Sequence, residues 1–410
     1  MNFSFIHVAD IHLGRPFSNL SDTQACKNAV EKAFNNFINY ALVKNVDFVL
    51  IAGDTFDSTE QDFESKLILK EGLKKLEAAD IKVFIICGNH DPLPSYNKTT
   101  FNFDENSNIK IVGLNSNRYE DFIVTNKNNN KVALVHALSF TDTTFKENPT
   151  KYFSEPDKTL FNIGLLHCDV DASKESLYAP CSKSELEALN YDYLALGHIH
   201  KPSDLYVGTL QGRNTKETGE HGIRYVKVEN GQIIKNTFVN SDVIRFEEEE
   251  IDLTTAQDTT AAALLIQEKL QSLANTNCEY FYIKLTLKGF VDYYREINSE
   301  FIETTIEKVK ANSNGKIHIS EIFNNLIANI NEDELKDDEG MAGTLYKTIQ
   351  ENETFEKSYK KLEQQLKHLL QDCNFSEEEY AAFKTEITSK SKESCKNLCV
   401  QLYKNESKKD

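Results

Sequence analysis

The sequence predicts an α/β protein in which a layered domain comes first, a smaller α+β domain follows and a helical segment comes last. Over residues 1–240, short apolar runs alternate with segments of helical apolar spacing, a pattern typical of layered α/β domains. From about residue 243 the expected order becomes strand, helix, strand, helix, strand. Beyond residue 350, apolar residues recur every three or four positions, as on one face of a helix.

Each short apolar run of the first domain, 1–240, is predicted to form a strand. The runs are Phe3–Ala9, Phe48–Ala52, Val83–Cys87, Ile109–Leu114, Val132–Leu138, Phe161–His167, Tyr193–Leu196, Asp204–Val207, Ile223–Val228 and Ile233–Val239. Helices are expected at Thr23–Lys44 and Asp62–Ala79. The early runs are apolar on both faces, which indicates a sheet that is covered on both sides. Ligands of such domains gather beyond the carboxyl ends of the strands.

The next segment, 243–325, is long enough for a small separate α+β domain. Its strands are expected at Arg245–Leu253, Tyr280–Leu287 and Lys316–Ile322, with helices at Thr259–Ala274 and Ile297–Lys310. The acidic stretch NEDELKDDEG, residues 331–340, is interpreted as a linker or a solvated turn.

The remaining segment, 331–410, is predicted to be a helical tail. One apolar seam consists of Phe355, Tyr359, Leu362, Leu366 and Leu369. Ser376 and Glu379 have the spacing of a capping box before a second helix through Tyr380, Phe383 and Ile387. Amphipathic helices must bury their apolar faces. These two helices pack either on the rest of this chain or on a partner, so the tail is a candidate docking segment.

The composition excludes several classes of protein. The formal net charge is −18, and so acidic a chain binds DNA or anionic membranes poorly by itself, because neutralising phosphate requires Lys and Arg. The eight cysteines form no C-x-x-C pair, which indicates free thiols in a reducing compartment. The chain shows neither an 18-residue apolar stretch nor a leader-like start, so we expect a soluble, cytoplasmic protein.

Seven residues that can bind metal follow short apolar runs. They are Asp10, His12, Asp54, Asn89, His167, His198 and His200. In an extended chain, residues two apart face the same way, so each of the pairs 10/12 and 198/200 can reach one centre. Gly53, Gly88 and Gly197 each precede one of these residues, and glycine permits the sharp turn that aims the next side chain. The mixture of carboxylate, carboxamide and imidazole suits Mn²⁺, Fe²⁺ or Zn²⁺.

Any one of these residues could be a turn former or a hydrogen-bonded structural residue. Their shared position, directly after a strand, favours a common metal centre instead. Seven ligands exceed what one tetrahedral ion needs and suit two ions that share a bridging carboxylate. Two ions roughly 3.5–4 Å apart activate a water between them and clamp a phosphoryl group for in-line attack.

In sequence order, the patterns D-x-H, G-D, G-N-H-D, a lone H and G-H-x-H resemble those of the calcineurin-like metallophosphoesterase superfamily. HVADIHLGRPF, LIAGDTFD, GNHDP, LALGHIHKP and GTLQGRNTKETGEHGIRYVKV most resemble its DNA-repair nuclease branch, the SbcD exonuclease subunits and YhaO-type proteins. The resemblance covers residues 1–240, extends weakly to 243–325 and leaves the tail unassigned. It implies a core of two β-sheets flanked by helices, with a small α+β capping domain.

The resemblance also implies a role for each residue. Asp10, His12 and His200 would hold one ion, Asn89, His167 and His198 the other, and Asp54 would bridge both. The ions would be Mn²⁺, with Fe²⁺ or Zn²⁺ as alternatives. His90 would contact the phosphate and protonate the leaving oxygen, and Asp91 would orient His90. Some nuclease relatives carry a second histidine three residues after the bridging Asp. This chain has Asp57 there, so catalysis would depend on His90.

These expectations describe a DNA phosphodiesterase. Its main expected activity is that of an exonuclease, and endonuclease activity is a second expectation. It would be the nuclease subunit of a complex with an SbcC-like coiled-coil ATPase, and a homodimer is a further expected assembly. Two alternatives stay open: a phosphatase or phosphodiesterase of small molecules, and a DNA-end tether in which metal serves folding only. Five basic residues near the motifs either contact a nucleic-acid backbone or are ordinary surface charges: Arg15, Lys201, Arg213, Lys216 and Arg224.

Overall fold

A computed structural model shows the protein as two compact units, each described here by itself. One unit comprises Met1–Glu247 with Thr276–Ile283, and the other Glu248–Asn275 with Lys284–Asp410. The structure describes residues 1–14, 17, 28–96, 101, 103, 107–114, 117–173, 175–274, 278–327, 332–350 and single positions between 385 and 399. The tail residues Phe355 to Ile387 named above, and Arg15, lie outside the described residues.

The larger sheet of the first unit has six strands in the order β10-β9-β1-β2-β3-β4. Their bounds are β1 (Phe3–Val8), β2 (Phe48–Ala52), β3 (Lys82–Ile86), β4 (Ile109–Ile111), β9 (Gly222–Glu229) and β10 (Gln232–Asn240). β1 to β4 pair in parallel, while β9 is antiparallel to β1 and to β10. The carboxyl ends of β1, β2 and β3 therefore meet at one edge.

The smaller sheet has the order β5-β6-β7-β8, with β6, β7 and β8 parallel and β5 antiparallel to β6. Its strands are β5 (Tyr119–Thr125), β6 (Lys131–Leu138), β7 (Phe161–His167) and β8 (Tyr193–Gly197). The prediction of a core of two β-sheets flanked by helices is confirmed.

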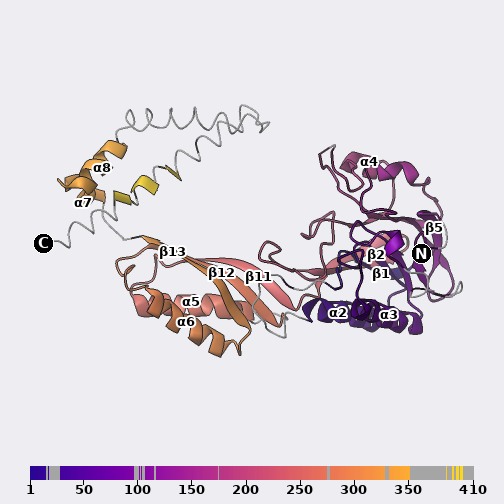
Figure 1. The fold of residues 1–410 in the computed structure, drawn as a ribbon, viewed down its shortest axis with the longest axis horizontal. Helices are drawn as coiled ribbons and strands as arrows, with labels where there is room; N and C mark the ends of the chain where they lie inside the picture. The colour runs from indigo at the N-terminus through magenta and orange to yellow at the C-terminus, as the bar shows by residue number, and fades with distance from the viewer. Residues whose placement is uncertain are drawn as a thin grey trace. The chain divides into compact units, whose positions relative to one another are not determined.

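Side chains on alternate positions of each central strand face two different cores. Phe5 and Phe48 stack with ring centroids 5.0 Å apart in the core between the sheets. Ile6 and Val49, their chain neighbours, pack on the opposite face. That face is covered by α2 (Ala29–Lys44) and α3 (Phe63–Ala78), which lie beside each other (Figure 1). The two-faced apolar runs are thus explained by a sheet with helices on one side and a second sheet on the other.

A buried histidine joins the two sheets. His7 of β1 places Nδ1 3.1 Å from the hydroxyl of Tyr193 and Nε2 3.1 Å from the carbonyl oxygen of Leu196, both on β8. A carbonyl oxygen only accepts, so Nε2 carries the proton of the neutral ring. Burial, helped by the charge of Arg224, lowers the pKa of His7 to about 3. The folded protein therefore holds this imidazole neutral.

This pKa shift predicts a loss of stability in mild acid. The folded pKa lies below the unfolded value of about 6.5, so the unfolded chain binds the extra proton first as the pH falls. The stabilisation is complete above pH ~6.5 and is lost progressively towards pH ~3. Between pH 6.5 and 4.5 the wild type should lose roughly 2–3 kcal/mol more unfolding free energy than His7→Gln, measured by urea denaturation. Parallel pH profiles for the two proteins would contradict this assignment.

The second unit is built around a three-stranded sheet of order β11-β12-β13. Its elements are β11 (Ile244–Asp252), α5 (Thr259–Ala274), β12 (Tyr280–Phe290), α6 (Ser299–Asn312) and β13 (Ile317–Ile327), and β11 and β12 begin in residues of the first unit. The two helices lie together along the sheet (Figure 1). The predicted order strand, helix, strand, helix, strand is confirmed, whereas the predicted domain boundaries stay a prediction.

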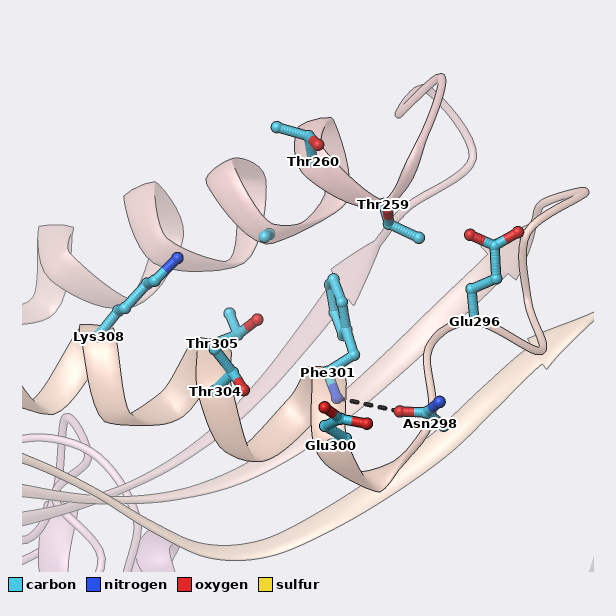
Figure 2. A pocket seen from close by; sticks show the side chains of 10 residues that line it. Thr259, Thr260, Glu296, Asn298, Glu300, Phe301, Thr304, Thr305 and Lys308 are labelled. Atoms are coloured by element: carbon cyan, nitrogen blue, oxygen red, sulfur yellow. Dashed lines mark hydrogen bonds between the residues drawn. The ribbon is translucent and has the colours of Figure 1, made fainter.

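An open hollow of about 430 Å³ lies between α5 and α6 in this second unit (Figure 2). Thr259, Thr304 and Lys308 are among the mostly polar residues that line it. Asn298 accepts a hydrogen bond from the amide of Phe301, 3.0 Å away, and so caps the first turn of α6. None of the seven predicted ligands lines this hollow.

Some predicted elements differ from the structure. The segment Asp204–Val207 forms a single bridge at Tyr206, not a strand, because the Tyr206 backbone closes a turn with Ser203: its carbonyl oxygen accepts from the Ser203 amide, and its amide donates to the Ser203 hydroxyl. The edge strand β5 was missed, since its side chains are mostly only partly buried and give no apolar run. The acidic stretch 331–340 contains a helix, α7 (Glu332–Asp337), before α8 (Met341–Gln350). In the part of the chain that the structure describes, no helix is long and apolar enough to cross a membrane.

Candidate metal centre

The loops that follow β1 and β2 are joined by backbone hydrogen bonds. The amide of Asp10 donates to the carbonyl oxygen of Gly53 (3.1 Å), and the amide of His12 donates to the carbonyl oxygen of Asp54 (3.0 Å). The ladder of the parallel strands thus continues past the strand ends. These bonds bring Asp10, His12 and Asp54 to one place.

The facing sheet delivers the remaining imidazoles. His167 ends β7, and His198 and His200 follow β8, whose last residue accepts a hydrogen bond from Cys168. His167 Nε2 lies 3.0 Å from Asn89 Oδ1 and 3.5 Å from Asp54 Oδ2. The rings of His167 and His198 are 5.2 Å apart, and the amide of His198 donates to the carboxylate of Asp10. The second sheet therefore closes the site over the first.

All seven predicted ligands gather in this one region. Among the described residues, groups whose donor atoms lie within 4.8 Å of one another are Asp10 with His12 and His200, Asp10 with Asp54 and His167, and His12 with Asp57 and His90. Asp54 Oδ2 lies 3.8 Å from His12 Nε2 and 3.5 Å from His167 Nε2. It therefore lies close to two imidazoles that the resemblance assigns to different ions.

The backbone at this site adopts the left-handed region. The φ angles are 49° at Asp10, 51° at His12, 48° at Asp54 and 110° at His198. Many of the other non-glycine residues with positive φ are Asn, at helix ends and turns where this conformation is common. A histidine in this region costs of order 1–3 kcal/mol and persists only where the surroundings impose it, typically at functional sites.

The glycines before the ligands are needed mainly for space. Only Gly53 of the three has a positive φ, 85°. A Cβ on Gly88 would lie 2.1 Å from Asp54 Oδ1, and one on Gly197 would lie 2.1 Å from the carbonyl oxygen of Ala52. The expectation that each glycine serves a sharp turn is therefore right for Gly53 alone. At Gly88 and Gly197 the reason is the close approach of neighbouring loops.

Buried carboxylates repel one another in this region. Burial and the charge of Asp54 raise the pKa of Asp10 well above its usual value, and they raise that of Asp91 to about 7. Burial alone would raise the pKa of Asp54 as well, but the imidazoles of His167 and His12 lower it overall. Burial also lowers the pKa of His12 to about 4 and that of His198 to about 3. Burial thus favours the neutral form of His12 and His198, which is the form that binds metal.

The polar atoms fit a cation. His167 Nδ1 lies 2.9 Å from the carbonyl oxygen of Ala52 and must donate to it, which leaves Nε2 with its lone pair. That lone pair faces the inward carboxamide oxygen of Asn89 and the carboxylate of Asp54, both acceptors. The fully buried His12 Nε2 has no hydrogen-bond partner among the described residues. Acceptors that face one another without a proton between them are typical of a metal site.

His90 is held by Asp57, not by Asp91 as the resemblance implies. His90 Nδ1 lies 2.7 Å from the carbonyl oxygen of Asp57, and the His90 amide donates to Asp54. The carboxylate of Asp91 accepts from the amides of Thr55, Phe56 and Gly88 and from the hydroxyl of Tyr96. These four donors join the loops after β2 and β3, and none of them is the His90 imidazole.

The loop between β8 and β9 adds residues to which the motifs assign no role. Arg213 is only 4% exposed at its side chain and lies 3.3 Å from both Asp57 and Glu217, while Glu217 Oε1 lies 3.0 Å from His200 Nδ1. Lys201 and Lys216 are exposed, and the half-buried Arg224 donates to the carbonyl oxygen of Ser203. The only sequence signal for Arg213 and Glu217 was their place in the Gly-rich segment after G-H-x-H. The cysteines that the structure describes form no disulfide.

Comparison with known proteins links these residues to a family. The calcineurin-like phosphoesterase family matches residues 3–202, which include all seven predicted ligands. An uncharacterized metallophosphoesterase, YhaO of Bacillus subtilis (strain 168), is 30% identical over 305 residues, 70% of this chain and 72% of that protein. The DNA double-strand break repair protein Mre11 of Thermoplasma acidophilum is 22% identical over 322 residues, 74% of this chain and 80% of its own. A solved dimetal phosphatase from Danio rerio aligns with 56% of this chain and 93% of its own at 11% identity, with a TM-score of 0.34.

Proposed function

Because this chain belongs to the calcineurin-like metallophosphoesterase family, we propose that it hydrolyses DNA phosphodiester bonds with two divalent metal ions. The observation that carries this proposal is the gathering of Asp10, His12 and His200 in one group and of Asp10, Asp54 and His167 in another, with Asp54 Oδ2 3.8 Å from His12 Nε2 and 3.5 Å from His167 Nε2. The remaining ligands, Asn89 and His198, contact or face His167. This arrangement provides donors for two neighbouring ions that share Asp54, an arrangement used in two-metal phosphoester hydrolysis.

The proposed ion is Mn²⁺, with Fe²⁺ or Zn²⁺ as alternatives, since the donors are carboxylate, carboxamide and imidazole without thiolate. When bound, two such ions make water a strong nucleophile at neutral pH and stabilise charge on a phosphoryl group. One ion would take Asp10, His12 and His200, the other Asn89, His167 and His198, and Asp54 would serve both. Imidazoles whose neutral form is favoured can bind these cations, and the cations would relieve the repulsion between the buried carboxylates.

His90 is the proposed general acid. The reaction forms a bond from the water oxygen to phosphorus and breaks the bond to the leaving oxygen, which needs a proton. His90 Nδ1 donates to the carbonyl oxygen of Asp57, so the transferable proton would be on Nε2. Because its backbone amide also donates to Asp54, the imidazole is anchored directly beside the shared metal ligand. Such a fixed acid typically contributes 10²–10⁴-fold to the rate.

DNA as the substrate is supported by the relative Mre11, whose name describes DNA double-strand break repair. The net charge of −18 opposes independent binding to a polyanion. We therefore propose a complex with a coiled-coil ATPase of the SbcC type, which would supply the missing DNA affinity. The tail, 331–410, is the proposed docking segment. Exonuclease activity is the main expectation, with endonuclease activity as the second.

The same charge favours one alternative, a phosphatase or phosphodiesterase of small molecules. Such a substrate carries few charges and would not need a long basic surface. The metal site and His90 would then act as described, and only the substrate would differ. The structural tether, our third alternative, has no use for an acid positioned beside the shared metal ligand.

The test is hydrolysis of linear duplex DNA and of bis(p-nitrophenyl) phosphate by the metal-free chain after addition of Mn²⁺. We expect both to be cleaved, the ATPase to stimulate cleavage of DNA alone, and chelation by EDTA to abolish both activities. Cleavage of the small diester without any cleavage of DNA, even with the ATPase present, would support the alternative. No Mn²⁺-dependent cleavage of either substrate would contradict the proposed function.

A further inference from the structure

A buried guanidinium connects two carboxylates behind the metal centre. Arg213 lies in the loop between β8 and β9, with Nη1 3.3 Å from Asp57 Oδ1 and Nη2 3.3 Å from Glu217 Oε1. Its backbone amide also donates to Glu217 Oε2, 2.9 Å away. An arginine that is removed from solvent and paired with two acids is fixed in position. It cannot reach far towards a substrate without leaving both partners.

Each of these carboxylates faces the Nδ1 atom of one predicted metal ligand. Asp57 Oδ1 lies 3.1 Å from His12 Nδ1, close but poorly aligned for a hydrogen bond, and Glu217 Oε1 lies 3.0 Å from His200 Nδ1. A neutral imidazole has one N–H, so a proton drawn to Nδ1 leaves the lone pair on Nε2. The carboxylates thereby favour the tautomer that can bind metal through Nε2, at His200 by a hydrogen bond and at His12 by the nearby negative charge.

One contact competes with this assignment. Arg213 Nη2 lies 2.8 Å from His200 Nδ1 and 3.3 Å from His200 Nε2. His200 Nδ1 cannot donate to Glu217 and accept from Arg213 at the same time. The carboxylate is the stronger partner of an N–H because it is charged. The Arg213 guanidinium then lies against the edge of the His200 ring, and its N–H groups donate to Glu217 and Asp57.

The backbone that carries Glu217 is itself fixed. His221 is buried, with Nδ1 2.8 Å from the hydroxyl of Thr209 and Nε2 3.2 Å from the carbonyl oxygen of Glu217. The Thr209 amide donates to the carbonyl oxygen of His200. A closed set of contacts therefore links the loop to the ligand that it supports.

The support is one-sided. His12 and His200 are both assigned to the ion that Asp10 also binds, and both face the Arg213 network. His167, assigned to the other ion, is held by the backbone carbonyl of Ala52 instead. A change at Arg213 should therefore affect one ion and spare the other.

We propose that Arg213, Asp57 and Glu217 form a positioning network that fixes His12 and His200 for one of the two metal ions. This inference rests on the proposed two-metal function. None of the three residues needs to touch the substrate. Losing an outer partner of a metal-binding histidine typically costs 10–100-fold in metal affinity, and that loss should be confined to one ion.

The test is calorimetric titration of the metal-free full chain with MnCl₂, with electron paramagnetic resonance to detect a coupled Mn²⁺ pair. Glu217→Gln and Asp57→Asn each remove one of the two carboxylates, and Arg213→Lys removes the guanidinium that pairs with both. Arg245→Lys is the matched control, because Arg245 is similarly buried (6% exposed at its side chain) and pairs with Asp242 and Glu220, neither of which is a predicted ligand. Thermal unfolding of each metal-free variant checks that it folds.

We expect two Mn²⁺ per wild-type chain and per Arg245→Lys chain. In the three network variants one dissociation constant should rise about 10–100-fold and the other stay unchanged, with the coupled signal restored by excess Mn²⁺. Variants that bind both ions as tightly as the wild type, or that weaken both equally, would overturn the positioning role. A KM for the small diester that stays raised in Arg213→Lys at saturating metal would also overturn it, since Arg213 would then contact substrate. A wild-type chain that binds a single ion would overturn the two-metal function itself.

Discussion

A His90→Ala variant is expected to lose about 10²–10⁴-fold in kcat for phosphodiester hydrolysis while it still binds two divalent ions. The centroid of the His90 ring lies 4.9 Å from that of the His12 ring, and His90 Nδ1 donates to the carbonyl oxygen of Asp57. It is therefore held beside the centre, and it is not one of the seven predicted ligands. Removing the side chain should remove a proton donor and leave the metal count unchanged. The measurement is steady-state turnover of bis(p-nitrophenyl) phosphate together with Mn²⁺ titration.

The interpretation of this variant depends on a control and on the number of ions bound. His318→Ala, in the second unit, is the matched control and should retain wild-type turnover. If His90→Ala binds only one ion, His90 is a ligand and the assignment of the general acid is wrong. Turnover at the wild-type rate would exclude a catalytic role altogether.

An Asp54→Asn variant is expected to lose the stabilisation that metal confers on the fold. Asp54 Oδ1 accepts from the amide of His90, and Oδ2 lies 3.8 Å from His12 Nε2 and 3.5 Å from His167 Nε2. An amide in its place carries no charge for two cations to share. Because metal binds the folded state, wild-type Tm should rise with Mn²⁺, by the equivalent of about 2.7 kcal/mol at a hundred times the Kd. In Asp54→Asn this shift should vanish, and turnover should fall by more than the roughly 10–100-fold expected for an outer partner.

Asp47→Asn provides the comparison for this variant. Asp47 accepts hydrogen bonds from the amides of Ser4 and Lys127, away from the metal centre. Its replacement is expected to lower Tm without changing the shift produced by Mn²⁺. An undiminished Mn²⁺ shift in Asp54→Asn would show that Asp54 is not shared by the ions, and the division of ligands into two sets would have to be redrawn.

The acidity of the chain has a different meaning at the site than on the surface. Buried carboxylates such as Asp10 and Asp54 create a local demand for cations, while the net charge of −18 repels a polyanionic substrate. Bound metal ions would neutralise the buried carboxylates, but they would offset only part of the repulsion between the chain and a polyanion. This is the physical reason to expect that a partner, and not this chain alone, supplies most of the affinity for DNA.

Much of the core, and the strand ends at which the candidate ligands stand, could be predicted from local pattern. The strands β2 and β7 begin and end at the predicted residues, because an apolar run between turn formers is a local signal. Asp10 and His12 were found because their spacing of two residues and their place after a strand are visible in one short stretch. The edge strand β5 and the helix in 331–340 were not found, because half-exposed or acidic residues carry no such signal.

What the sequence by itself determined is which side chains are available to metal and at which strand ends they stand. The tertiary structure alone decided what supports them. Arg213 and Asp57 are 156 positions apart, and Asp91 accepts from an amide 36 positions away in the loop after β2. The left-handed backbone at His12 and His198 is likewise imposed by neighbouring loops. Local spacing specifies strand ends, whereas contacts between distant segments exist only after the two sheets have packed.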